Sequence, residues 1–405
     1  MNGKHQHTAR FGAYQITSSF QPIVSFSYGR TIGHEGLMRG VDPAGQSVSP
    51  LRLIAQADVA GTLVEIDRTA RQLHLANYAG MNLSDGWLFL NMHPQSFSSL
   101  QDEPIGRNED TASGHSTLLP NRIVIEILED AVKDDIQFDD GVAIIRRRGW
   151  GIALDDFGAG HSNFDRVWRI KPDIVKLDAS YAHRSTADPA ARRMLPSIVA
   201  LLHEAGSLVL LEGIETAEQA MIAMDADIDF GQGFYFARPA PADITMQCDV
   251  EPLLKQLWPG FDLMRHSRQH SYSENMMPYL GALGLCSARL EAGVSPDDAL
   301  VDFLGLENSE RCFLLNSEGY QVGPNYLSRT FTRPAALAAF QNASNARWSR
   351  RPYFHRAINH MGTVQITRPY RSIATSQLCV TVSIGLLIDG ETHVLCGDVL
   401  WNDLP

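Results

Sequence analysis

The stretch G-I-A-L-D-D-F at 151–157 is typical of a buried strand that ends in two adjacent aspartates, and D-I-V-K-L-D at 173–178 is typical of the strand that follows. Residues 158–172 lie between them, which is enough for the helical crossover that two parallel strands require. This unit therefore predicts a parallel α/β sheet, buried on both faces.

The same alternation extends outward over residues 14–240. Amphipathic stretches such as 62–78 and 189–205 separate most of the apolar runs. We expect eight strands, at Phe20–Phe26, His34–Arg39, Trp87–Met92, Ile123–Leu128, Gly151–Phe157, Asp173–Asp178, Leu208–Ile214 and Gly231–Phe236. Eight strands over roughly 230 residues fit a β/α barrel better than an open sheet.

The first two expected strands depart from the usual barrel pattern. Little more than Ser27-Tyr28-Gly29-Arg30 separates them, which is too short for a parallel crossover, so they should pair as an antiparallel hairpin. The predicted fold is an α/β, TIM-like (β/α)8 barrel with one antiparallel strand over residues 1–250, followed by a smaller α+β domain.

The rest of the chain is expected to form two further parts. Residues 251–305 should be a mainly helical connector, interrupted at Pro259-Gly260, with a new helix starting at the N-cap Ser295. Residues 306–405 should form the smaller domain. Its expected elements are a hairpin turning at Ser317-Glu318-Gly319, helices at Arg333–Gln341 and Pro352–Asn359, and a meander of Val364–Tyr370, Leu378–Leu387 and Thr392–Trp401.

Composition excludes several classes of protein. The formal net charge is −12, and residues 1–250 hold 21 Lys and Arg against 32 Asp and Glu, so we expect no binding to a nucleic-acid polymer. We interpret Arg146-Arg147-Arg148 as cations at a solvated helix end. The five cysteines lack Cys-x-x-Cys spacing. Residues 1–11 have no apolar core of the kind that a signal peptide needs, and no apolar run is long enough to span a bilayer. We therefore expect reduced thiols, no membrane segment and a cytoplasmic protein.

Polar residues mark the carboxyl ends of the expected strands, where β/α barrels carry their active sites. They are Glu35, Asn91, Glu126, Asp155, Asp156, Lys176, Glu212 and Glu215. Oxygen ligands of this kind suit Mg²⁺ or Mn²⁺, and paired metal ions commonly serve phosphodiester cleavage. A single strand-end acid is more often a surface or capping group, and Asp155-Asp156 could cap the next helix. So many such positions on consecutive strands favour a metal site.

These segments also carry a resemblance to a known family. Q-P-I-V at 21–24, H-E-G-L-M-R at 34–39, L-F-L-N-M at 88–92, I-V-I-E-I-L-E at 123–129, A-L-D-D-F-G-A-G-H-S at 153–162, D-I-V-K-L-D at 173–178, L-E-G-I-E-T at 211–216 and G-Q-G-F-Y-F-A-R-P at 231–239 together resemble EAL-domain cyclic di-GMP phosphodiesterases. The resemblance covers about residues 14–245 in order. It implies a barrel with a reversed strand and hydrolysis of cyclic di-GMP to linear pGpG.

The resemblance also implies roles for single residues. By this match, Glu35, Asn91, Glu126 and Asp155 would bind the first of two Mg²⁺ or Mn²⁺ ions, and Asp155 and Asp156 the second, with Glu212 nearby. Lys176, Asp156 and Glu212 would be catalytic, with Lys176 orienting the attacking water. Gln21, Leu37 and Arg39 would line the substrate groove, while Glu215 and Gln232 would support the metal site. Glu129 would hold the loop Phe157–Asn163.

Four positions differ from the family pattern. Gly36 replaces the signature alanine, Ala159 and His161 replace the usual Thr and Tyr of the Asp-Asp loop, and Leu211 replaces an alanine. We interpret His161 as a polar surface group. None of the four changes removes a metal ligand, so they bear on the rate more than on the chemistry.

Residues 311–325 and 348–354 resemble a Cache or PAS-like sensor fold. Arginines and tyrosines suit carboxylate ligands, and six of them could line a pocket: Arg350, Arg351, Tyr353, Arg368, Tyr370 and Arg371. The alternative is a domain used only for dimerisation. The favoured reading of the whole chain is a phosphodiesterase, expected as a homodimer and regulated by its C-terminal domain. The alternatives are a catalytically weak cyclic di-GMP receptor that acts through protein partners, and an unrelated metal-dependent barrel hydrolase.

Overall fold

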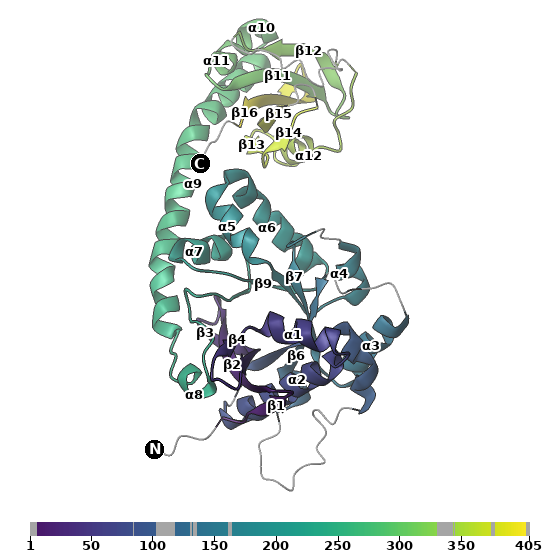
Figure 1. Cartoon of the computed structure of the whole chain (residues 1–405). Coiled ribbons are helices and arrows are strands. Elements are labelled where there is room, and N and C mark those ends of the chain that lie inside the picture. The colour runs from purple at the N-terminus through teal and green to yellow at the C-terminus, as the bar shows by residue number, and fades with distance from the viewer. Residues whose placement is uncertain are drawn as a thin grey trace. The chain divides into compact units, whose positions relative to one another are not determined.

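The computed structural model describes residues 6–83, 85–102, 118–129, 132, 136–160, 164–329, 343, 345–373 and 377–401. The chain divides into two compact units, Met1–Leu263 and Met264–Pro405, which are described separately (Figure 1). The helix expected at Arg333–Gln341 lies outside the described residues, as do His161, Ser162 and Asn163. All five cysteines are free thiols. Among the described helices, none is both long and apolar enough to cross a bilayer.

The first unit contains a closed barrel, which confirms the predicted fold (Figure 1). Its eight strands are β2 (Tyr14–Ser25), β3 (Arg30–Val41), β5 (Trp87–Asn91), β6 (Ile123–Leu128), β7 (Gly151–Phe157), β8 (Ile174–Leu177), β9 (Leu208–Leu211) and β10 (Phe230–Gly231), with the short strands β1 (Ala9–Phe11) and β4 (Ser47–Val48) attached. Strand β2 is antiparallel to β3 and to β10, and the remaining barrel neighbours are parallel. The reversed strand is the one that the short first turn predicted.

Helices surround the barrel and bury its outer surface. They are α1 (Pro50–Val59), α2 (Leu63–Gly80), α3 (Ile136–Arg147), α4 (Phe164–Ile170), α5 (Ala179–Ala187), α6 (Pro189–Glu204), α7 (Ala217–Asp225) and α8 (Ala242–Thr245), with 3-10 turns η1 (Pro94–Asp102) and η3 (Pro120–Arg122). Capping side chains fix several helix starts. Ser49 caps α1 and Asp178 caps α5, while Thr216 and Gln219 form a capping box at α7.

An apolar layer fills the barrel below the strand ends. It consists of Ile23, Phe89, Val124, Ala153, Ile174, Leu210 and Phe230, one residue from each of seven strands. Side chains alternate along a strand, so the next inward-facing position lies two residues further on. In the parallel strands those positions are Asn91, Glu126, Asp155, Lys176 and Glu212. The predicted polar residues therefore lie next to the apolar layer, on its mouth side.

Gly36 of β3 faces His74 of α2. A Cβ on Gly36 would lie 3.0 Å from His74 Cγ and 3.1 Å from its Cβ. His74 has little freedom to move, because it is buried, bonds the Ser18 hydroxyl at 2.8 Å and meets the Phe20 ring edge-on. Burial also lowers the pKa of His74 to about 4, so the ring is neutral near pH 7. The His74 side chain therefore occupies the space that a methyl group at residue 36 would need.

The second unit is an antiparallel sheet between helices. The sheet order is β12 (Gln321–Leu327), β11 (Ser309–Asn316), β16 (Glu391–Leu400), β15 (Leu378–Ile388) and β13 (Gln365–Ile366), and β14 (Tyr370–Arg371) also pairs with β15. Side chains of α9 (Glu251–Glu291), α10 (Pro296–Ala299) and α11 (Val301–Leu304) cluster with one set of sheet residues, and α12 (Pro352–Asn359) packs with another. The expected hairpin at Ser317-Glu318-Gly319 and the Ser295 N-cap are both confirmed.

Helix α9 is continuous where we expected an interruption at Pro259-Gly260. An interior proline costs a helix about 3 kcal/mol or more. Leu254, Leu257 and Phe261 are buried on either side of it, and a Cβ on Gly260 would lie 3.1 Å from Met221 Sδ of α7. Packing of this part of α9 within the first unit thus outweighs the local helix-breaking tendency of Pro259-Gly260.

Restoring the family's alanine at residue 36 should destabilise the protein. Overpacking a filled site usually costs about 1–3 kcal/mol, so Gly36→Ala should lower the free energy of unfolding by about that amount. In a His74→Ala background the same change should cost less, because the clashing ring is gone. A double-mutant cycle from denaturant unfolding measures the coupling. An equal cost in both backgrounds would show that the two residues do not compete for space.

Candidate active site

The mouth of the barrel holds a cavity of about 290 Å³ that several of the predicted polar residues line. Its lining is Gln21, Glu35, Leu37, Asp155, Glu212, Gly213, Glu215, Gln232, Gly233 and Phe234. Asn91 joins the same group through a hydrogen bond to Glu35, and Glu126 and Lys176 join it through ion pairs. The residues come from consecutive barrel strands, as parallel strands that share one carboxyl edge require.

Lys176 lies at the centre of the carboxylates. Its Nζ is 2.6 Å from Glu126 Oε1, 2.7 Å from Glu212 Oε1 and 2.8 Å from Asp155 Oδ1, with Glu35 Oε2 at 4.0 Å. The side chain is only 1% exposed. Burial alone would lower the pKa of Lys176, but Asp155, Glu126 and Glu212 raise it well above its ordinary value. The ammonium therefore stays charged and holds three acids together.

Amide side chains hold the Glu35 carboxylate from two directions. Asn91 Nδ2 donates to Glu35 Oε1 at 2.9 Å, and Gln232 Nε2 donates to Glu35 Oε2 at 2.7 Å. Gln232 Nε2 also donates to Gln21 Oε1 at 3.1 Å, which brings the reversed strand into the network. Burial acts to raise the pKa of Glu35, but Lys176 and these two amides outweigh it, so the pKa is lowered and the group remains a carboxylate.

Three other acids at the barrel mouth have raised pKa values. Burial and then the Glu35 charge raise the pKa of Glu126 well above its usual range. Burial and then Asp155 raise the pKa of Asp156. Burial raises the pKa of Glu212 to about 8, with Lys176 opposing it and Asp155 adding to it. One lysine does not balance this many acids, so the mouth favours an additional cation.

The donor set fits a divalent metal ion. Asp155, Asp156 and Glu212 each offer an oxygen, and these oxygens lie within 4.8 Å of one another. Glu126 Oε2 is buried and receives no hydrogen bond from any described residue. All of the donors are oxygen atoms, which hard cations such as Mg²⁺ and Mn²⁺ prefer.

The backbone at Asp156 explains how two adjacent aspartates face one site. Neighbouring residues of a regular strand point to opposite faces. Asp156 has φ 56°, in the left-handed region, and the β7–β8 register shifts between Leu154 and Phe157. This irregularity at the end of β7 turns the Asp156 carboxylate toward the same cation position as Asp155.

The remaining predicted residues lie around this centre. Glu35, Leu37 and Arg39 share one face of β3, and the half-buried Arg39 donates from NH1 to Met38 O at 2.8 Å. Glu215 is exposed at the rim. Glu129 is buried just beyond β6, where its Oε2 accepts a hydrogen bond from Gly158 N of the Asp-Asp loop at 3.2 Å.

Sequence reasoning missed Phe234 at the rim of the cavity. Its side chain is exposed and the Arg238 guanidinium lies 4.1 Å from the ring centroid. The G-Q-G-F-Y-F-A-R-P segment contains three aromatic residues, and local pattern does not distinguish the exposed ring from the buried one at Phe236. An exposed aromatic ring at the rim of a polar cavity is a surface on which a planar ring of a ligand can stack.

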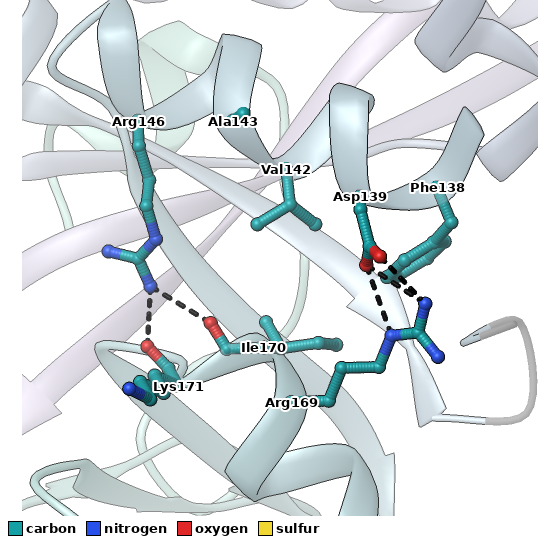
Figure 2. Close-up of a pocket in the computed structure, with 8 residues that line it drawn as sticks. All are labelled: Phe138, Asp139, Val142, Ala143, Arg146, Arg169, Ile170 and Lys171. Atoms are coloured by element: carbon teal, nitrogen blue, oxygen red, sulfur yellow. Dashed lines mark hydrogen bonds and ion pairs between the residues drawn. The ribbon is translucent and has the colours of Figure 1, made fainter. Parts of the chain in front are cut away.

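A larger cavity of about 520 Å³ lies between α3 and α4, away from the carboxylates (Figure 2). Its charged side chains bond across the gap. Arg169 forms a bidentate pair with Asp139, and Arg146 donates to the carbonyl oxygens of Ile170 and Lys171. Because these groups serve to join two helices, we assign the chemistry to the barrel mouth.

Of the arginines and tyrosines expected to line a ligand site in the second unit, three come together. Tyr353 and Tyr370 stack with ring centroids 6.5 Å apart, and the Arg351 guanidinium lies 5.7 Å from the Tyr370 ring centroid. Arg350, Arg368 and Arg371 are exposed. Only part of the expected lining is therefore gathered in one place.

Comparison with known proteins identifies relatives of the first unit. A family model described as "EAL domain" matches residues 7–239. The chain is 28% identical over 237 residues to the probable cyclic di-GMP phosphodiesterase PdeG of Escherichia coli, and 28% identical over 236 residues to the cyclic di-GMP phosphodiesterase RocR of Pseudomonas aeruginosa. Each match covers 56% of this chain, with 45% of PdeG and 58% of RocR. The chain thus spans about half of the length of these relatives.

A solved structure matches both units. The Bacillus subtilis YkuI protein, with an EAL domain and in complex with cyclic di-GMP and calcium, aligns with a TM-score of 0.72. The alignment covers 95% of this chain and 94% of that one at 23% identity. At this identity the likeness concerns the fold, and it extends to the second unit.

Removing the Glu212 carboxylate should change how stability depends on pH in metal-free protein. The pKa of Glu212 is raised from 4.5 to about 8 in the folded state. Its stabilising contribution is therefore present below pH 4.5 and is lost as the pH rises through about 8. Melting temperatures measured in a chelator should show Glu212→Gln gaining on wild type across this range. A pH-independent difference between the two proteins would contradict the raised pKa.

Proposed function

The chain belongs to the EAL-domain family, and on that premise we propose that it is a metal-dependent phosphodiesterase that hydrolyses cyclic di-GMP to linear pGpG in second-messenger signalling. The observation that carries the proposal is the gathering of Asp155, Asp156 and Glu212 oxygens within 4.8 Å of one another, beside the Glu35 and Glu126 carboxylates. Relatives named as cyclic di-GMP phosphodiesterases support the choice of substrate. We expect the reaction to take place in the cytoplasm.

In this proposal two Mg²⁺ or Mn²⁺ ions bind at the barrel mouth. Glu35, Asn91, Glu126 and Asp155 would hold one ion. Asp155 and Asp156 would hold the other, with Glu212 direct or through water. When bound, such ions supply an activated water and polarised phosphoryl oxygens. The supporting observation is the buried Glu126 Oε2, which receives no hydrogen bond from the residues that the structure describes.

The chain's own residues would bind and orient the substrate. Gln21 and Leu37 line the cavity and would contact the nucleotide, and Phe234 would stack on a base. Arg39 would neutralise phosphate charge. Without such cations, the two phosphates of cyclic di-GMP would meet a mouth dominated by carboxylates. Metal dependence is therefore a requirement of substrate binding as well as of the chemistry.

Lys176 would position the attacking water for in-line displacement. Its Nζ lies within 2.6–2.8 Å of three proposed site acids, so a water bound among those acids would lie within its reach. Asp156 and Glu212 would accept hydrogen bonds from that water. Glu215 and Gln232 would keep the ligands in place, and the Gln232 bond to Glu35 supports that role. These contributions would be positional.

Removing one metal ligand should abolish hydrolysis. Glu35→Ala and Asp155→Ala each delete an anionic ligand from a two-ion site, so turnover of cyclic di-GMP should fall by at least about 100-fold with Mg²⁺ or Mn²⁺. Ca²⁺ should support binding without turnover, because it takes more ligands at longer distances. The measurement is separation of cyclic di-GMP from pGpG after incubation.

The matched control is Asp85→Ala, which removes an exposed acid whose ion pair with Arg30 lies just before β5, at the opposite strand end. Its activity should equal that of wild type. Full activity in either ligand variant would refute the metal assignment. Binding of cyclic di-GMP by wild type without hydrolysis under Mg²⁺ or Mn²⁺ would instead favour a receptor that acts through protein partners.

We further propose that residues 306–405 act as a PAS/Cache-like sensor or dimerisation domain that regulates the barrel of residues 1–250 through the connector 251–305. Continuity of α9 over Glu251–Glu291 supports this, because helical connectors transmit orientation better than flexible ones. The stacked Tyr353 and Tyr370 beside Arg351 are a candidate contact for a small-molecule ligand. The expected assembly is a homodimer.

Deleting the second unit should change turnover or oligomeric state. The fragment should end after Leu263, because Leu254 and Leu257 belong to the core of the first unit and a cut at residue 250 would remove them. We expect fragment 1–263 to keep its metal site but to differ from the full chain in rate or in sedimentation. A folded fragment that matches the full chain in both would show that the second unit does not regulate the first.

A further inference from the structure

The Glu129 carboxylate bridges the Asp-Asp loop and helix α4. Its Oε2 accepts a hydrogen bond from Gly158 N at 3.2 Å, and its Oε1 lies 3.1 Å from Arg166 NH1. The Glu129 side chain is 4% exposed and that of Arg166 is 23% exposed. A buried carboxylate needs a partner of opposite charge to stay in place, and Arg166 provides one at the edge of the solvent.

Gly158 is fixed from its other side by Tyr181. Gly158 has φ 97°, and a Cβ there would lie 2.1 Å from Tyr181 Cε2 and 2.6 Å from its hydroxyl oxygen. The backbone therefore rests directly against the ring of α5. Gly158 follows Asp156 by two residues, so a shift of Gly158 must move the end of β7 that carries the Asp156 carboxylate.

The described part of this loop is also bonded to the N-cap residue of α5, where Asp178 N donates to Phe157 O at 3.2 Å. Ala159 stands where the family usually has a threonine, so that hydroxyl is missing, and Ala159 N donates to Asp156 O at 3.1 Å within the turn itself. The Glu129 bond and the Tyr181 contact thus hold Gly158 to the rest of the unit. Arg166 is the cation that pairs with Glu129 in this arrangement.

We propose that Arg166 is a positioning residue for Asp156: its guanidinium orients the Glu129 carboxylate, which fixes Gly158 and with it the end of β7. The inference rests on the proposed metal-dependent function for its effect on turnover. Its effect on the order of the loop is independent of that function. The contact through which Arg166 would act is its ion pair with Glu129.

Helix α4 is held in place without Arg166 (Figure 2). Arg169 pairs with Asp139 of α3 at 2.9–3.1 Å, and Arg146 NH2 donates to Ile170 O at 3.0 Å and to Lys171 O at 2.5 Å. Loss of the Arg166 charge should therefore loosen the Glu129 carboxylate while leaving the helix docked. Arg169 is a matched control, because it lies on the same helix, its side chain is 25% exposed, and Arg146 still joins α3 to the end of α4 when the Arg169 pair is removed.

The experiment compares Arg166→Gln with Arg169→Gln in the full chain. Amide exchange of peptides that contain Gly158, measured by mass spectrometry, should be about 5-fold faster in R166Q, since one hydrogen bond is weakened. Mn²⁺ affinity and kcat for cyclic di-GMP should each fall by about 10-fold, with KM little changed. R169Q should match wild type in exchange near Gly158, and Arg166→Lys should restore most of the loss.

Two results would overturn the proposal. One is equal exchange at Gly158 in R166Q and R169Q. The other is an R166Q protein that melts earlier but whose folded fraction keeps wild-type kcat and Mn²⁺ affinity, which would make Arg166 merely structural. If R166Q does not fold, Arg166→Met against Arg169→Met decides by the same exchange measurement, because methionine keeps much of the side-chain length and removes the charge. If wild type does not hydrolyse cyclic di-GMP, the proposed function fails. Amide exchange and Mn²⁺ affinity would still test whether Arg166 positions Asp156.

Discussion

The structure depends on one buried ammonium group among several buried acids. Lys176 Nζ contacts Glu126, Asp155 and Glu212 within 2.8 Å at the mouth of the barrel. Carboxylates at this separation repel one another, and burial strengthens the repulsion. Lys176 reduces that cost without cancelling it, since the pKa of Glu126 and that of Glu212 both stay raised. The barrel thus presents a preformed site whose remaining negative charge selects a cation.

Strand geometry explains why these acids meet. The apolar layer of Phe89, Val124, Ala153, Ile174 and Leu210 fills the barrel, and the next inward position on each of those strands is polar. The reversed strand reaches the same level because Gln21 pairs with Glu35 in the hairpin register. A shift of one residue in any of these strands would turn its polar side chain out of the mouth. The buried apolar layer therefore fixes the strand register on which the site depends.

One buried acid of the second unit, Asp398, is paired inside the protein. Asp398 is fully buried in its sheet, and its carboxylate receives Arg311 Nε at 2.8 Å and the Thr381 hydroxyl at 2.6 Å. Arg311 NH1 also donates to Asn325 Oδ1 at 3.1 Å. The Asp398 carboxylate therefore has its cation and a hydroxyl donor within the protein. At the barrel mouth, by contrast, Glu126 Oε2 receives no hydrogen bond from the described residues. An external ligand would supply its partner.

The sequence alone determined the strand sequence, the hairpin at Ser27–Arg30 and the order of polar residues at the strand ends, because each follows from local periodicity and from the length of a connection. Only the tertiary structure decided why residue 36 is glycine, why α9 continues through Pro259-Gly260, that Phe234 lies at the rim and that Arg166 reaches Glu129. Each of these depends on a contact between residues distant in the chain. Periodicity reports which face of an element is buried, whereas the identity of the neighbour on that face is set by packing.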